Sequence, residues 1–187
     1  MKRSRLTLAA LALLAAAPFA ASAADGISYT YVEGGYVATN TDTGDADGWG
    51  LKGSAALTPS FHLFGDFANQ DLENSSVDFD QWRVGVGYNQ QISRNADVVT
   101  RIAYEKFDAG AGLDFDGYSV EAGVRGSLAP AIEGYAMAGY EDGDEYEGDF
   151  YGRLGAQWKF NPNWGVATDV KFSEGDTQWF VGPRLTW

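Results

Sequence analysis

The sequence predicts an all-β protein, a single up-and-down antiparallel β-barrel that crosses a lipid bilayer. Three observations indicate this fold: segments of alternating polarity, joints that alternate between short and long, and aromatic residues near the strand ends. Aromatic residues make up 14% of the chain and Gly is frequent, which argues against a disordered acidic chain. We expect ten strands, with eight as the alternative if two of the hairpins are long loops.

Residues 1–23 have the pattern of a secretory signal peptide. A basic start (1–5) and an apolar run (6–17) precede an Ala-Ser-Ala cleavage site. The apolar run is shorter than the roughly 20 residues that a membrane-spanning helix needs. We therefore expect cleavage after Ala23, which leaves residues 24–187 as one barrel domain.

Ten segments of alternating polarity follow the signal peptide. The expected strands are 27–39, 48–57, 61–70, 80–89, 97–107, 117–126, 132–140, 150–160, 164–172 and 178–187. Four joints between them are short, and three of these contain Pro: 58–60, 90–96, 127–131 and 161–163. The other five joints are acidic and rich in Gly: 40–47, 71–79, 108–116, 141–149 and 173–177. Outer-membrane barrels have short periplasmic turns and longer outer loops, so we expect the acidic loops at the cell surface and both termini on the periplasmic side.

One face of each predicted strand is apolar, and the other carries charge. The charged face is expected to point inward and holds seven bases and six acids: Glu33, Lys52, Asp66, Arg83, Arg101, Glu105, Glu121, Arg125, Glu133, Arg153, Asp169, Lys171 and Arg184. This near balance indicates ion pairs, because buried charge is tolerated only when it is paired. We expect a filled polar interior, with a narrow channel as the alternative, since ten strands enclose far less space than the 16 of a water-filled porin.

Aromatic belts distinguish a membrane barrel from a soluble one. A secreted β-sandwich or a lipocalin-like barrel would also alternate in polarity. One belt opens the descending strands: Trp49, Trp82, Tyr118, Phe150 and Trp179. The other lies near the opposite rim: Tyr88, Trp158, Phe160, Trp164 and Trp187. Two such belts are typical of a barrel that spans a bilayer.

The last predicted strand has two features of its own. Alternating apolar residues near its end are expected to be the signal that the barrel assembly machinery reads: Trp179, Val181, Leu185 and Trp187. Pro183 lies inside this strand and lacks an N–H, so one ladder bond to the first or the ninth strand should be missing.

No residue pattern indicates an enzyme, a cofactor or a metal site. The only histidine, His62, lies at the expected periplasmic end of its strand, and the chain has neither Cys nor a Gly-x-Ser-x-Gly motif. Segment 42–48 lacks the spacing and the terminal Glu of a calcium loop. The acidic run 141–149 offers weak divalent-cation binding as an alternative to a solvated loop. Only ten of the 13 basic residues follow the signal peptide, against all 26 acids, so the chain should repel nucleic acid.

Several strings resemble a known family. They are YTYVEGGY (29–36), DADGWGLKGS (45–54), DQWRVGVGYN (80–89), DFYGRLGAQWKF (149–160) and GDTQWFVGPR (175–184). They are similar to the xanthomonad family of small outer-membrane proteins described as a diffusible quorum factor or activator of plant immunity. The chain more distantly resembles small barrels of the OmpA and OmpX type. The resemblance implies an outer-membrane barrel, shed in vesicles and linked to motility, biofilm and virulence, and it brings no catalytic residues.

Three functions remain open at this point. The first is a non-enzymatic, monomeric barrel that displays acidic loops and contacts outer-membrane lipid, lipopolysaccharide and divalent cations. The second is a narrow porin-like channel for ions or small solutes. The third is a shed or vesicle-borne signal that other cells or a host detect.

Overall fold

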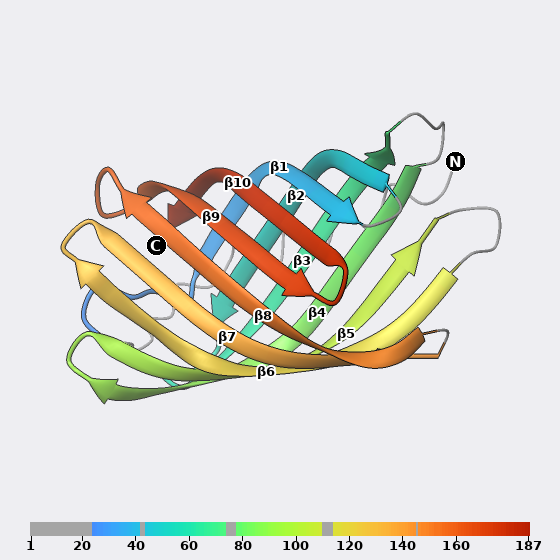
Figure 1. The fold of residues 1–187 in the computed structure, drawn as a ribbon. Coiled ribbons are helices and arrows are strands. Elements are labelled where there is room, and N and C mark those ends of the chain that lie inside the picture. Colours follow the sequence, from blue (N-terminus) through green and yellow to red (C-terminus); the bar gives the residue numbers. More distant parts are fainter. Residues whose placement is uncertain (1–23, 42–43, 74–77, 110–113, 145) are drawn as a thin grey trace.

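The computed structural model describes residues 24–41, 44–73, 78–109, 114–144 and 146–187. These residues form ten strands: β1 (Tyr31–Thr41), β2 (Gly44–Ala56), β3 (Phe61–Leu72), β4 (Asp78–Ser93), β5 (Ala96–Asp108), β6 (Asp114–Ala129), β7 (Ile132–Gly143), β8 (Tyr146–Lys159), β9 (Trp164–Ser173) and β10 (Asp176–Thr186). Each strand pairs antiparallel with the next, and β10 pairs with β1 to close the barrel (Figure 1). The prediction of a ten-stranded up-and-down barrel is confirmed. Within the described residues no helix is long and apolar enough to cross a membrane.

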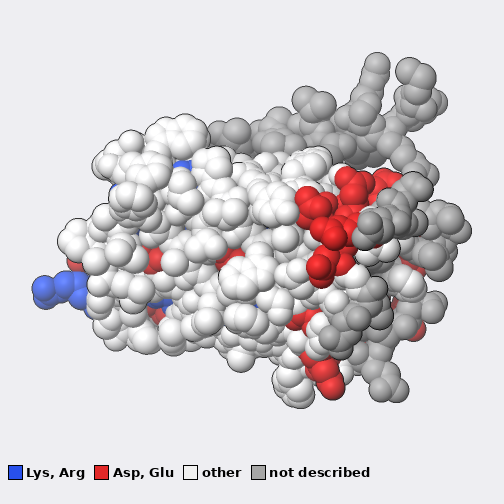
Figure 2. Space-filling model, turned by 45° about the horizontal axis from the view of Figure 1, so that its top comes forward, with Lys and Arg blue, Asp and Glu red and all other residues white. Residues whose placement is uncertain are grey.

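The long acidic loops are shorter than predicted, because the strands continue into them. The expected loop 141–149 is mostly paired strand, with Glu141 opposite Asp149 and Gly143 opposite Tyr146. Asp, Glu and Gly disfavour strands on average. Here the backbone ladder of an existing hairpin continues through them, and the side chain of Asp144 is exposed to water. The acids gather at this end of the barrel (Figure 2), which we call the acidic end, and the end with the four short turns is the turn end.

Large apolar side chains cover the outside of the barrel between its two ends. Val84, Ile102 and Val181 are 59%, 63% and 47% exposed, and all residues of both predicted aromatic belts are exposed as well. The charged residues of the inward strand faces lie inside, so the wall of the barrel is apolar outside and polar inside. This is the polarity of an outer-membrane barrel and the reverse of a soluble one. The secreted sandwich or lipocalin-like alternative is therefore excluded.

The seam between β1 and β10 contains the irregularity that Pro183 predicts. Pairing runs as far as Glu33 opposite Arg184 and resumes at Tyr36 opposite Val181, so the ladder is interrupted beside Pro183. On the β9 side Pro183 stays in register. A Cβ at Gly35 would lie 2.2 Å from the carbonyl oxygen of Val181, so only glycine allows the two backbones to approach this closely.

Aromatic rings enter the lumen above glycines of the neighbouring strand. Tyr135 of β7 faces Gly155 of β8 in the register, and a Cβ at Gly155 would lie 2.3 Å from Tyr135 Cζ. The ring therefore occupies the volume that a side chain at 155 would fill. Its hydroxyl then reaches across the lumen and donates a hydrogen bond to Asp169. The glycine thereby allows a hydrogen bond between side chains of different strands.

We predict that Gly155→Ala destabilises the barrel by about 1–3 kcal/mol, because the methyl group overlaps the Tyr135 ring. The measurement is the urea midpoint of unfolding in detergent micelles, read from heat-modifiable gel migration. Gly152→Ala is the matched control on the same strand, since a Cβ there meets only Phe172 at 3.9 Å. Equal midpoints for the two variants would contradict this reading of the interior.

Candidate functional site

The candidate site is the charged interior of the barrel. All thirteen charged residues expected on the inward face lie on strands and take part in ion pairs within the lumen. We call these thirteen residues the lumen network. Period-2 alternation places them there, because every second side chain of a barrel strand points inward. The network has three parts. The central layer consists of Lys52, Asp66, Arg83, Arg101, Glu105, Glu121, Arg153 and Asp169. The layer toward the turn end consists of Glu33, Arg125, Glu133 and Arg184, and Lys171 forms one pair toward the acidic end.

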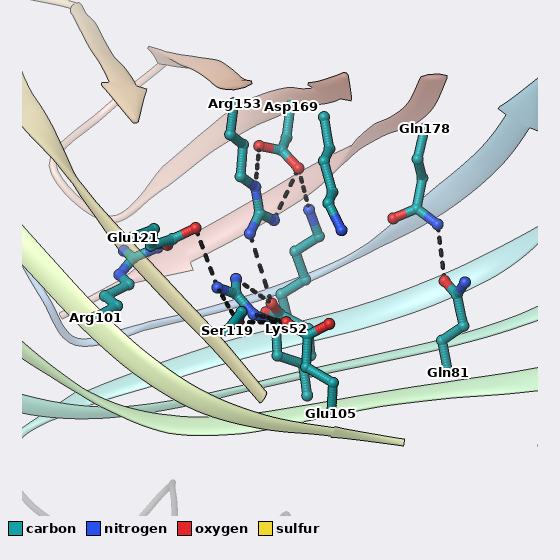
Figure 3. Close-up of polar contacts among 12 residues, drawn as sticks. Lys52, Gln81, Arg101, Glu105, Ser119, Glu121, Arg153, Asp169 and Gln178 are labelled. Carbon is teal, nitrogen blue, oxygen red and sulfur yellow. Dashed lines mark hydrogen bonds and ion pairs between the residues drawn. The ribbon is translucent and has the colours of Figure 1, made fainter. Parts of the chain in front are cut away.

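Figure 3 shows Glu105 and Glu121, two acids of the central layer that contact Arg83 of β4. The Arg83 guanidinium is 3.0 Å from Glu121 Oε2 and 2.9 Å from Glu105 Oε1. Glu121 also pairs with Arg101 Nη1 at 3.2 Å and accepts a hydrogen bond from the Tyr151 hydroxyl at 3.0 Å. Glu121 is 1% exposed. A carboxylate this deeply buried is tolerated because two guanidinium groups and a hydroxyl surround it.

Asp169 of β9 is the second centre of this layer. Arg153 Nε and Nη2 donate to its two oxygens at 2.8 and 2.9 Å, and Lys52 Nζ lies 2.8 Å from Oδ1. Lys52 is on β2, so this contact reaches past β1 and β10. Bidentate Arg–carboxylate geometry is among the strongest charged contacts in proteins.

Asp66 joins the two halves of the central layer. Its Oδ2 atom is 3.7 Å from Arg83 Nη1 and 4.0 Å from Arg153 Nη1. Asp66 lies on β3 and Arg153 on β8, which are on opposite sides of the ten-stranded ring. The ion pairs therefore cross the full width of the lumen.

A second layer lies toward the turn end. Glu133 pairs with Arg125 and with Lys159, the latter at 3.1 Å, and Arg184 pairs with Glu33. Arg184 Nη1 also lies 3.8 Å from Glu133 Oε1, which links the two groups. The two acids and the two arginines of this layer are each at most 5% exposed.

Residues 24–30 close the turn end, which corrects the predicted strand 27–39. The strand begins only at Tyr31, and the preceding residues fold into the lumen. Tyr29 stacks on His62 with 4.6 Å between ring centroids, and Arg125 donates to the Ser28 carbonyl at 2.9 Å. Alternation of polarity alone predicted a strand here. In the structure, buried polar groups of the lumen bind residues 24–30 in place of a neighbouring strand.

The acidic end is the more open end. A cavity of about 400 Å³ lies above the central layer, and its lining includes Lys52, Arg83, Arg153 and Lys171. Lys171 pairs with Glu141, which the sequence analysis had assigned to a loop. The floor of this cavity is the central layer itself.

Sequence reasoning missed several residues of the interior. His62 and Asp97 are completely buried, and Tyr29 is 1% exposed. The two-residue period of a strand could have placed two of them inside, because His62 lies on the same strand face as Asp66, and Asp97 on the same face as Arg101. His62 Nδ1 lies 3.3 Å from Asn89 Oδ1.

The other sequence expectations concern the strand end and the acidic run. Trp179 and Val181 are exposed on the outside of β10, and their role as an assembly signal, with Leu185 and Trp187, stays a prediction. Among the described residues no group of three His, Asp or Glu side chains could hold a metal ion. Part of the acidic run 141–149 lies outside the described residues, as does part of segment 42–48.

Comparison with solved structures finds outer-membrane barrels at low identity. A KdgM porin is 14% identical over 83% of this chain and 99% of its own, with a TM-score of 0.47. Ail, the attachment invasion locus protein of Yersinia pestis, is 17% identical over 84% of this chain and 97% of its own, with a TM-score of 0.42. A de novo designed transmembrane β-barrel is 12% identical over 86% and 98%, with a TM-score of 0.45. No protein-family model matches the chain, and no curated protein does.

We predict that Asp169→Asn lowers the free energy of unfolding by about 3–5 kcal/mol, because Arg153 and Lys52 would keep buried charges without their carboxylate. The control is Asp114→Asn, whose partner Lys106 lies 3.8 Å away in a half-exposed pair. That change should cost less than about 1 kcal/mol. Urea titration of the protein in micelles measures both, and a smaller loss for Asp169→Asn than for the control would refute the buried-pair interpretation.

Proposed function

We propose that the protein is a non-enzymatic, monomeric outer-membrane barrel with a closed lumen, which presents its acidic end at the cell surface and acts by contact with other molecules. The observation that carries this proposal is the chain of ion pairs from Arg153 through Asp66 to Arg83 across the lumen. Below it, the second layer and residues 24–30 fill the turn end.

Pairing inside the lumen supports closure over conduction. An ion that passes the central layer must displace a partner from Glu121 or Asp169, each of which has two cationic side chains in contact. Breaking such a buried pair leaves an uncompensated charge, which is costly. The interior is therefore better suited to hold the barrel rigid than to pass solutes.

The acidic end supports a role in display. Acids from several hairpins are exposed there, among them Asp45, Asp78 and Asp144. Three interactions are open to such a surface. It repels anionic lipopolysaccharide directly, divalent cations bridge it to lipopolysaccharide, or it binds a basic partner. The apolar belt would contact outer-membrane lipid, and the last strand would be read by the barrel assembly machinery.

A non-enzymatic role is proposed from the chemistry of the interior. The one histidine contacts an asparagine amide and an aromatic ring, rather than a nucleophile and an orienting acid. The charged groups of the lumen network neutralise one another, which leaves them poorly placed to transfer protons.

A narrow channel is the second candidate function. The cavity of about 400 Å³ at the acidic end favours it, because charged side chains of both signs line an entrance for ions or small solutes. For this function the central layer would have to open.

A shed or vesicle-borne signal is a hypothesis that rests only on the resemblance of several strings to the xanthomonad family, and so are roles in biofilm, motility and virulence. Purified protein free of lipopeptide must still trigger a response in recipient cells for this hypothesis to stand.

We predict that pure folded protein produces no steady conductance in planar bilayers in concentrated KCl, because the ion pairs span the lumen. The double variant Arg83→Ala with Glu121→Ala removes one base and one acid from the central layer and should produce channels. Heat-modifiable migration shows whether each sample is folded. Reproducible channels from the unaltered protein would overturn closure and favour the second candidate.

We predict that neutralising the acidic end weakens contact with cationic surfaces. The variant combines Asp45→Asn, Asp78→Asn and Asp144→Asn, and the control is Asp25→Asn, an exposed acid near the turn end. Capture of cells on polylysine, biofilm mass and vesicle yield are measured for both. If all three stay at the level of the control, display of acidic hairpins is not the function.

A further inference from the structure

Asp97, near the start of β5, is a buried acid that differs from the other buried acids of the lumen. Its side chain is completely buried. Each of the others has an Arg or Lys in ion-pair contact: Glu33, Glu121, Glu133 and Asp169. Within the described part of the chain, no Lys, Arg or His side chain forms an ion pair with Asp97. Arg125 lies opposite Asp97 in the β5–β6 register, but its guanidinium pairs with Glu133. A buried carboxylate without a cation in contact is costly, so Asp97 lacks an ion-pair partner.

The atoms that contact Asp97 come from the segment that closes the turn end. The backbone nitrogen of Ala24 lies 3.2 Å from Oδ1 and 3.5 Å from Oδ2. The Tyr29 hydroxyl donates to Oδ2 at 3.0 Å. Ala24 itself is 1% exposed and packs in the same apolar cluster as Tyr29 and Val99. Both carboxylate oxygens are thus directed at a single buried nitrogen.

We propose that Asp97 is the binding site for the mature N-terminus, and that removal of the signal peptide after Ala23 supplies its missing cation as the Ala24 ammonium. This inference rests on the proposed export of the chain. Hydrolysis of the peptide bond between residues 23 and 24 uses one water, which gives a carboxylate on one side and an amine on the other. The α-amine is largely protonated at neutral pH, because its ordinary pKa is about 8.

Other contacts also hold residues 24–30 at the turn end, so the Ala24 ammonium adds an ion pair to a segment that is already bound. The Ser54 hydroxyl donates to the Tyr29 carbonyl at 2.7 Å, and the Asp25 N–H donates to the Arg94 carbonyl at 2.9 Å. Lys159 donates to the carbonyl of Gly26. Burial raises the pKa of the Tyr29 hydroxyl well above its usual range, so Tyr29 contacts Asp97 as a neutral donor. Chain ends are mobile unless such contacts hold them, so the charge created by cleavage closes the turn end most firmly in the processed protein.

The test compares chains 24–187 refolded in micelles, with a free or an acetylated Ala24, in the parent, in Asp97→Asn and in Asp25→Asn. The unfolding midpoint and the rate of amine labelling at Ala24 are measured, the latter from the N-terminal peptide by mass spectrometry. Acetylation should lower the midpoint of the parent and of Asp25→Asn, and should have no further effect in Asp97→Asn. Labelling near neutral pH should be about tenfold slower in the parent than in Asp97→Asn, as expected for one unit of difference in amine pKa.

An unchanged midpoint on acetylation, or equal labelling rates, would overturn the inference. If Asp97→Asn does not fold, the acetylation effect in the parent and slower labelling of folded than of urea-unfolded parent decide the question. N-terminal sequencing of protein extracted from cell membranes is independent of these measurements. A first residue other than Ala24 would refute the ion pair with Asp97 while leaving the closed barrel intact, whereas channels from the folded protein would refute closure and leave the ion pair intact.

Discussion

The structure depends on the pairing of charges in a lumen too narrow to hydrate them. Glu121 and Asp169 are each enclosed by two cationic side chains and a tyrosine hydroxyl. Burial penalises each charge alone, and the neighbouring opposite charges compensate for it. Because the partners come from different strands, the pairs also constrain which strands face one another. The same contacts that make the interior tolerable therefore rigidify the barrel.

Strand spacing alone would not bring these groups together. Lys52 reaches a strand three places away, and Asp66 contacts an arginine on the opposite wall. Long side chains make such contacts possible, and small residues provide the volume, as where Tyr135 lies over Gly155. Charge and glycine placement in the strands are thus two parts of one arrangement, in which a bulkier residue in the wall would displace a partner from the network.

Two groups of acids in this protein have different environments. The acids of the lumen network are paired with bases, whereas many acids of the hairpins are exposed at the acidic end (Figure 2). The net negative charge of the chain is therefore almost entirely a property of one end. The opposite end is closed by residues 24–30, whose polar backbone groups satisfy side chains of the second layer. The two ends of the barrel are chemically distinct, which suits a protein that faces two compartments.

Alternation of polarity and the spacing of the joints predicted ten strands, with eight as the alternative, and the inward face of the thirteen lumen residues, because a β-strand has a period of two and a closed barrel has one inside. The sequence even located the seam irregularity at Pro183. Only the tertiary structure decided which charges pair with one another. It also decided that residues 24–30 bind inside the turn end and that Asp97 has no ion-pair partner among the described side chains. Parity states which way a side chain points, but the distance between two inward side chains depends on shear and tilt around the ring. The acidic hairpins resemble loops by composition. They are strands nevertheless, because pairing with a neighbouring strand outweighs the preference of each residue alone.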